Sequence, residues 1–223
     1  MRKLTYYVAC SVDGFIAHTD GSHDGFSQDS AYFADLFATF PETVPSHLRA
    51  AMGINAENQW FDVVLMGRKT YEIGMKDGVT SPYSHLKQFL FSRSLEESPD
   101  KNVELISDNA VELITALKRE RGKGLWLCGG ANLAADLFAH RLIDRLILKI
   151  NPFIMGSGIP LFSGTIQQTS LKLIDSKIYQ NGVSMLYYSR FAEIIREKAN
   201  CHNESVTRSR VGIYGRANRE RTS

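Results

Sequence analysis

The sequence predicts an α/β fold, a three-layer α/β/α sandwich whose mostly parallel central sheet ends in an antiparallel C-terminal hairpin. Apolar, strand-like runs alternate with helical patterns along most of the 223 residues, which is typical of parallel sheets with helices on both faces. The chain then ends in two strand patterns separated by Asn181-Gly182, a strong hairpin signal. An apolar content of 43% can form a substantial core, so we expect one domain over residues 1–191.

The predicted strands are short apolar runs bounded by turn residues. They cover residues 4–11, 61–66, 87–92, 103–106, 145–150, 171–178 and 183–191, together with the run from 125 to the double glycine at 129 and 130. The predicted helices repeat apolar residues at helical spacing. They cover residues 29–40 and 46–52 and the stretches that begin after Gly67, Asp108 and Gly130, with Asp29 and Asp108 as expected N-caps. Residues 41–59 are expected to be an insertion.

Charge and composition exclude several classes of protein. Residues 1–191 carry 19 Lys or Arg against 20 Asp or Glu, whereas residues 192–223 carry seven against four. This basic, polar tail has no aromatic platform for nucleic acid, and we expect it to be disordered. No apolar run approaches the roughly 18 residues that cross a bilayer, and we see no secretory signal, so we expect a cytoplasmic protein without a membrane or nucleic-acid partner. The three cysteines lack metal-like spacing, so no metal site is predicted.

The stretch WFDVVLMGRKTY, residues 60–71, is the part of the chain around which the site is predicted. A buried, β-branched strand runs directly into Gly67, Arg68, Lys69 and Thr70, which open a short helix. The first backbone N–H groups of a helix have no internal partner and bind anions, and the two cations and the hydroxyl can hold phosphate oxygens. The alternative is a solvated helix start after a simple turn.

A second junction of the same kind follows at LWLCGGANL, residues 125–133. Here an apolar strand runs into Gly129-Gly130 and then into a helical pattern. Two such junctions can converge on one ligand if their strands belong to the same parallel sheet, because ligands collect at the carboxyl ends of such strands. Gly130 then either lets the backbone approach a phosphate or only serves a turn with positive φ.

Several motifs in order resemble the dihydrofolate reductase superfamily. They are SVDGFIA after Ala9, MGRKTYE, Ser92-Arg93, CGGANL and INPFIMGSGIPLF, and together they span about residues 3–191. The chain is most similar to the reductase domain of the bifunctional riboflavin-biosynthesis deaminase-reductase and to its stand-alone bacterial relatives. No deaminase half accompanies these motifs, so we expect a reductase alone.

The resemblance implies an NADPH-dependent reductase. By that resemblance, the phosphates meet the Gly67 junction, Ser92 and Arg93 lie by the 2′-phosphate, the double glycine meets the pyrophosphate, and the nicotinamide meets the first strand and its loop. The cofactor-binding residues implied are Ala9, Ile16, Gly67, Arg68, Lys69, Thr70, Ser92, Arg93, Gly129, Gly130, Ala131, Asn132 and Leu133. Independently, three cations at strand ends suit a 2′-phosphate, whereas NAD sites present an acid to the ribose.

The substrate side is predicted from the same resemblance. Dihydrofolate reductases place one carboxylate on the helix after the first loop to bind the pterin and assist its protonation, and Asp29 occupies the corresponding point. Asp29 is therefore the implied catalytic residue, with Asp13 and Tyr32 as implied substrate contacts, while a plain N-cap is the alternative for Asp29. In the later strand, Lys149 replaces the hydroxyl that would meet a folate substrate.

We therefore expect a riboflavin-type reductase, similar to 5-amino-6-(5-phosphoribosylamino)uracil reductases, that delivers hydride to a heterocycle or a ribosylamine C=N. Two alternatives stay open: a dihydrofolate reductase, and a non-catalytic NADPH-binding protein. The relatives that it resembles often pair, and Met185–Tyr188 put apolar residues on both faces of the final hairpin, so a homodimer is expected.

Overall fold

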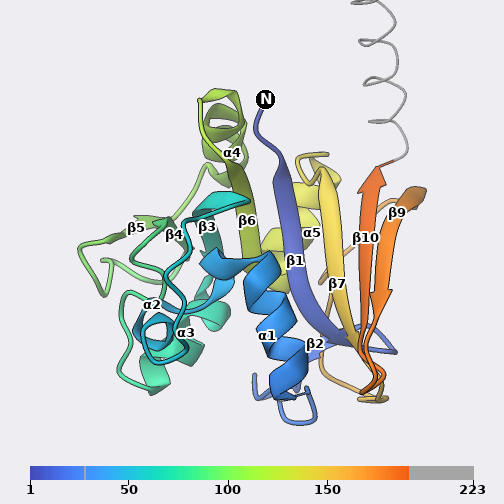
Figure 1. Cartoon of the computed structure of the whole chain (residues 1–223). Coiled ribbons are helices and arrows are strands. Elements are labelled where there is room, and N and C mark those ends of the chain that lie inside the picture. Colours follow the sequence, from blue (N-terminus) through green and yellow to red (C-terminus); the bar gives the residue numbers. More distant parts are fainter. Residues whose placement is uncertain (28, 191–223) are drawn as a thin grey trace, which may run out of the picture.

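The computed structural model describes residues 1–27 and 29–190, and an eight-stranded sheet forms its centre (Figure 1). The strands of this sheet are β1 (Leu4–Ser11), β3 (Phe61–Gly67), β4 (Lys87–Phe91), β5 (Val103–Ile106), β6 (Gly124–Gly129), β7 (Arg145–Asn151), β9 (Leu171–Ile178) and β10 (Ser184–Arg190). The helices are α1 (Ser30–Thr39), α2 (Ser46–Arg49), α3 (Arg68–Lys76), α4 (Ala110–Arg119) and α5 (Ala131–Ala139), with a 3-10 turn, η1, at Pro41–Thr43. The predicted tail, 192–223, lies outside the described residues.

The strand order is β5-β4-β3-β6-β1-β7-β10-β9. The first six strands in this order are parallel, whereas β10 is antiparallel to both β7 and β9. The predicted mostly parallel sheet with an antiparallel C-terminal hairpin is therefore confirmed. Because six strands run the same way, their carboxyl ends lie along one edge of the sheet, which is the edge where such folds bind ligands.

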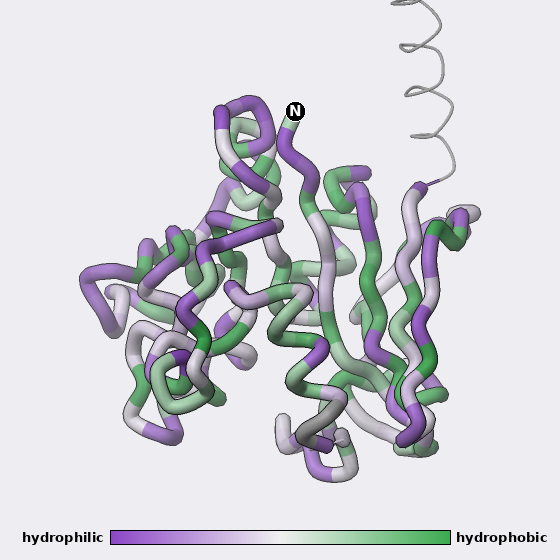
Figure 2. The backbone as a smooth tube through the Cα atoms, viewed as in Figure 1, coloured by the Kyte–Doolittle hydropathy of each residue, from purple (hydrophilic) through white to green (hydrophobic). Residues whose placement is uncertain are grey.

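Helices cover both faces of the sheet, which makes the three predicted layers. Tyr32 and Leu36 of α1 pack against one face, while Ile114 of α4 and Leu137 of α5 pack against the other. Figure 2 shows hydrophilic residues concentrated in the peripheral loops and hydrophobic residues along the central strands. Within the described residues, no helix combines the length and the apolar character that crossing a bilayer requires.

A second, two-stranded sheet joins the loop after β1 to the loop after β7. It pairs β2 (Phe15–Ala17) with β8 (Ile159–Pro160). The chain segments after β1 and β7 are thereby held together at the carboxyl edge of the main sheet. The sequence predicted an extended piece after the turn at residues 12–14, but it predicted neither β8 nor the pairing of β8 with β2.

Two predicted helix starts are corrected. The N-cap of α4 is Asn109 rather than Asp108, and it has a left-handed backbone with φ 55°, which asparagine tolerates better than most residues. The predicted helix over 46–52 shortens to α2, whose N-cap is Pro45. Its first residue, Ser46, uses its hydroxyl for contacts with the loop before β4, where it lies 2.9 Å from His85 Nδ1 and accepts from Ser84 N at 2.8 Å.

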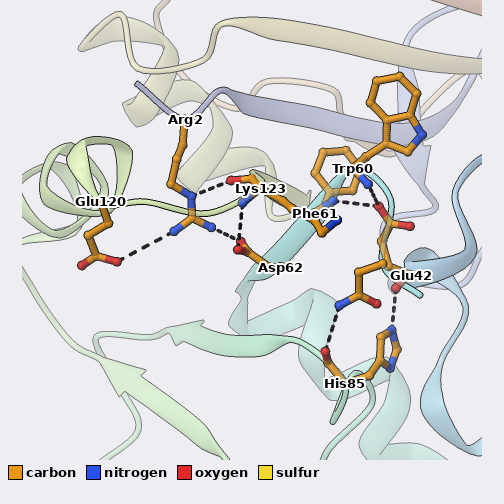
Figure 3. A network of polar contacts seen from close by, with 9 residues as sticks. Arg2, Glu42, Trp60, Phe61, Asp62, His85, Glu120 and Lys123 are labelled. Atoms are coloured by element: carbon orange, nitrogen blue, oxygen red, sulfur yellow. Dashed lines mark hydrogen bonds and ion pairs between the residues drawn. The ribbon is translucent and has the colours of Figure 1, made fainter.

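Buried polar contacts fasten residues 41–59, the segment predicted as an insertion, and the amino ends of the strands (Figure 3). Glu42, which is fully buried in η1, accepts hydrogen bonds from the amides of Trp60 at 2.6 Å and Phe61 at 2.7 Å. Nearby, the Arg2 guanidinium donates to Asp62, whose other oxygen accepts from Lys123 N at 2.9 Å. These contacts hold the amino end of β3 in place. They therefore help to position its carboxyl end, where Gly67 lies.

Candidate functional site

The two strand-glycine-helix junctions touch each other at the carboxyl edge of the sheet. Strands β3 and β6 are parallel neighbours, with Met66 opposite Gly129. A Cβ atom placed on Gly67 would lie 3.0 Å from Gly130 Cα, which is tighter than most real Cβ contacts. The structure therefore brings together the two junctions that the sequence could join only on the condition of a shared sheet.

Two helix N-termini point at this shared edge. Helix α3 begins at Arg68 directly after Gly67, and α5 begins at Ala131 directly after Gly130. Both N-caps are glycines, Gly67 and Gly130, so neither N-cap offers a side chain to cap the first amides of its helix. The N-terminal amides of both helices thus stay available for an anionic ligand, and the partial positive charge of each helix end adds to the attraction.

The glycines are needed for packing between the two junctions. Gly130 has φ 110°, and its added Cβ would lie 3.0 Å from Gly67 Cα. A Cβ on Gly129 would lie 2.7 Å from Thr70 Oγ1. The interpretation that Gly130 serves a turn with positive φ is therefore confirmed. The Thr70 side chain packs against Gly129 of the second junction. Glycine is therefore required at positions 129 and 130 by contacts within the protein, in addition to any space that a ligand needs.

Three cations of the predicted cofactor site lie at neighbouring strand ends. Arg68 is half-exposed and its guanidinium forms an ion pair with Glu72 at 2.7 Å, one helical turn later. Lys69 is exposed, and Arg93 is exposed just after β4, the strand next to β3. Since an arginine has five N–H donors, Arg68 keeps several for another partner.

The serine before Arg93 has a structural use. The Ser92 hydroxyl accepts hydrogen bonds from Ser94 N at 3.3 Å and Leu95 N at 3.2 Å. It therefore closes the turn that follows β4. This turn directs the chain so that Arg93 remains exposed at the carboxyl edge.

Asp13 ties two loops of the site together. Its carboxylate accepts hydrogen bonds from Ser11 Oγ at 2.5 Å, Met155 N at 3.1 Å and Gly156 N at 2.7 Å. The Ser11 hydroxyl is the main cause that lowers the pKa of Asp13 to about 2, and the two loop amides add to it. Asp13 therefore positions the loop after β7 against the loop after β1, where the predicted nicotinamide contact Ile16 lies in β2.

The predicted substrate contacts on α1 have local structural partners. Asp29 is the N-cap of α1, and its carboxylate accepts from Tyr32 N at 2.8 Å. Tyr32 is 3% exposed, and its ring packs edge-on against Tyr179 with centroids 4.9 Å apart. The alternative interpretation of Asp29 as an N-cap is therefore what the structure displays, and Tyr32 belongs to the core.

Lys149, noted in the sequence only as a departure from folate enzymes, lies at this edge as well. It is on β7 opposite Ala9, the other predicted nicotinamide contact, and its Nζ lies 5.1 Å from the centroid of the Tyr7 ring. Burial lowers the pKa of Lys149 to about 8, and the neighbouring Cys128 opposes that shift. A lysine within the apolar strand RLILKIN was the sequence signal that could have selected it.

A cavity lined mostly by apolar groups lies at the opposite edge of the sheet. It has a volume of about 450 Å³ and lies at the amino ends of the strands, with lining residues that include Thr5, Phe40, Trp60, Arg145 and Tyr187. Among the described residues, none of the glycines or cations of the two junctions lines it. The chemistry that the junctions offer, anion binding at helix starts, is therefore spatially separate from this mostly apolar cavity.

Comparison with known proteins identifies relatives over most of the chain. The family model described as the RibD C-terminal domain matches residues 2–186. An uncharacterized protein of Bacillus subtilis, YwjB, is 31% identical over 186 residues, which cover 83% of this chain and 97% of the relative. A second uncharacterized protein of the same organism, YyaP, is 27% identical over 198 residues, covering 84% and 94%.

Solved structures share the fold. A putative riboflavin biosynthesis protein from Shewanella superposes with a TM-score of 0.62 at 24% identity, covering 85% of this chain and 99% of that one. A pyrimidine reductase-like protein from Corynebacterium diphtheriae gives 0.56 at 18% identity, covering 85% and 92%. A deaminase/reductase from Thermotoga maritima gives 0.56 at 16% identity, and the match covers 85% of this chain but 56% of that longer one.

Proposed function

The chain belongs to the RibD C-terminal domain family, and we propose that it is an NADPH-dependent reductase of the riboflavin type. In this proposal it transfers hydride to a heterocycle or a ribosylamine C=N, similar to 5-amino-6-(5-phosphoribosylamino)uracil reductases. The reductases named among its structural relatives support that substrate class.

The contact between the two glycine junctions is the observation that carries the proposal. It places two uncapped helix N-termini at one edge, beside the exposed cations of Lys69 and Arg93. A dinucleotide carries a pyrophosphate and, in NADPH, a third phosphate on the ribose, so several anion-binding elements at one sheet edge fit it well. When bound, the reduced nicotinamide would supply the hydride.

The residues proposed to hold this cofactor follow from their positions. The amides and side chains of Arg68, Lys69 and Thr70 would hold phosphate oxygens, and the start of α5, Ala131 to Leu133, would face the pyrophosphate. Arg93, one strand further out with Ser92 holding its turn, would meet the 2′-phosphate. Ala9 and Ile16, on β1 and β2, would border the nicotinamide.

Replacing Arg93 by Ala tests the assignment. Loss of a hydrogen-bonded charge pair should weaken NADPH binding by roughly 1.5–3 kcal/mol, while NADH, which lacks the 2′-phosphate, should bind as before. Calorimetric titration of both nucleotides measures the difference. The matched control is Arg119→Ala, an equally exposed arginine at the end of α4. Equal losses for NADPH and NADH would move Arg93 away from the 2′-phosphate.

A dihydrofolate reductase is less well supported than the riboflavin-type enzyme. That activity needs a carboxylate for the pterin, whereas Asp29 caps α1 and Asp13 holds loop amides. The side chain that enters the sheet face beside Ala9 is instead the cation Lys149. The positive charge of Lys149 therefore favours a ligand other than the pterin ring of dihydrofolate.

We also propose that the protein is a homodimer formed through β9. The prediction from Met185–Tyr188 needs a different basis, because Met185 is fully buried within the chain itself. The edge strand β9 instead exposes Leu173, Ile174 and Ile178, with Ile178 76% exposed. An exposed apolar edge strand is a surface that a second copy can cover by pairing about a two-fold axis.

A further inference from the structure

Lys149 is a cation beneath α1 to which the described residues offer no counter-charge within ion-pair distance. Its strand neighbours in register are Ala9 on β1 and Met185 on β10, so its side chain lies on the same sheet face as theirs. Within the described part of the chain, its ammonium forms no hydrogen bond or ion pair, and its one close partner is the face of the Tyr7 ring. It therefore has donors to offer at the carboxyl end of β7.

The ionisable groups around Lys149 do not neutralise it. On α1, Asp35 already accepts from Lys177 Nζ at 2.6 Å and from Tyr179 Oη at 2.5 Å, and Asp29 caps the helix. On β6, burial raises the pKa of the Cys128 thiol to about 11, so that group is neutral at physiological pH. The nearby phenols are Tyr7, Tyr32, Tyr83, Tyr179 and Tyr187, and burial raises the pKa of each. Two further carboxylates act on these phenols. Glu42, which acts on Tyr7, already accepts from the amides of Gln59, Trp60 and Phe61, and Asp175, which acts on Tyr187, is exposed to solvent.

A second donor of this layer also lacks a partner. Tyr7 is 3% exposed, and its hydroxyl is one of two buried side-chain polar atoms, with Ser189 Oγ, that have no hydrogen-bond partner among the described residues. Both Tyr7 and Lys149 thus carry unsatisfied donors on the face that α1 covers. Unpaired polar groups in apolar surroundings destabilise a fold, and such groups cluster at functional sites.

We propose that Lys149 recognises the substrate, and that its ammonium donates a hydrogen bond to a carbonyl or anionic oxygen of the substrate's heterocycle. The inference rests on the proposed function, because it places this ring beside Ala9 and hence beside the nicotinamide. It adds to that function a residue that determines specificity: Lys149 would favour the carbonyl oxygens of the uracil ring, whereas a pterin is held through its amino donors by a carboxylate.

Two substitutions separate recognition from a structural use of the lysine. Lys149→Met keeps the length and apolar stem but removes the charge, and Lys149→Arg keeps the charge. Lys177→Met is the matched control, because Lys177 also lies over a ring, 5.2 Å from the Tyr179 centroid, but already has Asp35 as a partner. The probes are 5,6-diaminouracil and 2,4-diaminopteridine, titrated calorimetrically into the full chain.

We expect Lys149→Met to weaken binding of diaminouracil by about tenfold to a hundredfold, the effect of losing a charged hydrogen-bond donor. Lys149→Arg should retain much of the affinity, and Lys177→Met should bind as the wild type does. Affinity for the diaminopteridine should fall much less in Lys149→Met, because that ring carries amino groups in place of the carbonyl oxygens that the lysine is proposed to bind.

A second readout needs neither a variant nor turnover. In protein with 13C-labelled lysine, the Lys149 signal should titrate with a midpoint near 8. Saturating diaminouracil should raise that midpoint, because an acceptor stabilises the charged form. Diaminouracil affinity of the wild type should correspondingly fall as the pH rises through about 8.

The opposite results overturn the inference. A Lys149 midpoint near the ordinary value of 10.5 that diaminouracil leaves unchanged would show a solvated lysine held only by the Tyr7 ring. Equal affinity of the wild type and Lys149→Met for diaminouracil would show that Lys149 does not bind this ring. NADPH titration of the same samples keeps the two proposals apart. If the protein binds NADPH but its affinity for diaminouracil does not depend on Lys149, only this inference is contradicted. If diaminouracil binding depends on Lys149 but NADPH does not bind, only the proposed function is contradicted.

Discussion

Gly130 illustrates how single residues set the geometry of the site. Its φ of 110° is disfavoured for any residue with a side chain, and the space where a Cβ would go is occupied by the backbone of Gly67. The sequence identified the glycine and both possible reasons for it. It could not identify Gly67 as the neighbour, because that contact depends on β3 and β6 being adjacent strands.

Gly130→Ala should destabilise the protein because of both the strained backbone and the clash. Gly164→Ala is the control, since Gly164 has a similar φ of 113° but nothing within 4 Å of an added Cβ. We expect the Gly130 variant to be less stable than the Gly164 variant by roughly 1–3 kcal/mol, the typical range for overpacking. Urea unfolding measures both. Equal losses would mean that the two junctions can move apart without loss of stability.

For Asp29 and Lys149 too, the role of the residue depends on contacts that the sequence alone does not reveal. An aspartate before a helical pattern is as good an N-cap as a ligand contact, and the hydrogen bond to Tyr32 N shows that it caps. Lys149 was noted in the sequence only because it replaces the hydroxyl that would meet a folate substrate. Only the pairing of β7 with β1 places it opposite Ala9.

At the scale of elements, the strands and helices were predictable wherever a buried apolar run carried the signal. Strands β1, β5 and β9 have the predicted bounds, because their apolar patterns and turn residues agree. The insertion was the least predictable part. Its buried Glu42 accepts hydrogen bonds from the amides of Gln59, Trp60 and Phe61. A sequence pattern does not show that these backbone amides need a side-chain acceptor.

His85 makes the attachment of the insertion sensitive to pH. Its Nε2 donates to the Glu42 carbonyl at 2.9 Å, so its Nδ1 is the acceptor for the Ser46 hydroxyl at 2.9 Å. Burial lowers the pKa of His85 below its ordinary value of 6.5. The unfolded chain therefore binds a proton at a higher pH than the folded protein does, so His85 contributes stability above pH 6.5 that is lost as the pH falls towards its folded-state pKa.

His85→Gln should therefore reduce the loss of melting temperature on acidification. The comparison is the change in Tm between pH 7.5 and pH 5.5, about one unit on either side of the ordinary histidine value. His47→Gln, at an exposed histidine of α2, should change as the wild type does. A wild type whose Tm has the same pH slope as the His85 variant would contradict this account of the attachment.

At the scale of the whole molecule, the alternation of strands and helices was enough to predict the three layers, and Asn181-Gly182 between the last two strand patterns predicted the terminal hairpin. The expected face of the proposed homodimer changed, because Met185 of β10 is buried and the other apolar residues of that strand are partly buried, while those of β9 are exposed. A sequence pattern shows that a hairpin has apolar residues on both faces, but which strand forms the edge is a property of the sheet order.

Light scattering after gel filtration tests the proposed dimer. We expect a mass about twice the 25.0 kDa of one chain at micromolar concentration. Ile178→Glu should shift the mass towards one chain, because it would place a charge in the covered face, whereas Leu48→Glu, at an exposed leucine away from the hairpin, should not. A wild-type mass of one chain would contradict the proposal.

The central claim is that this member of the RibD C-terminal domain family reduces a substrate with NADPH, and turnover tests it most directly. The protein is mixed with NADPH and 5-amino-6-(5-phosphoribosylamino)uracil, and both NADPH oxidation and the mass of the product are followed. We expect oxidation that depends on the uracil substrate and a product heavier by two hydrogen atoms, with NADH much less effective. Tight NADPH binding without consumption of any heterocycle or imine would contradict the claim and identify a nucleotide-binding protein instead.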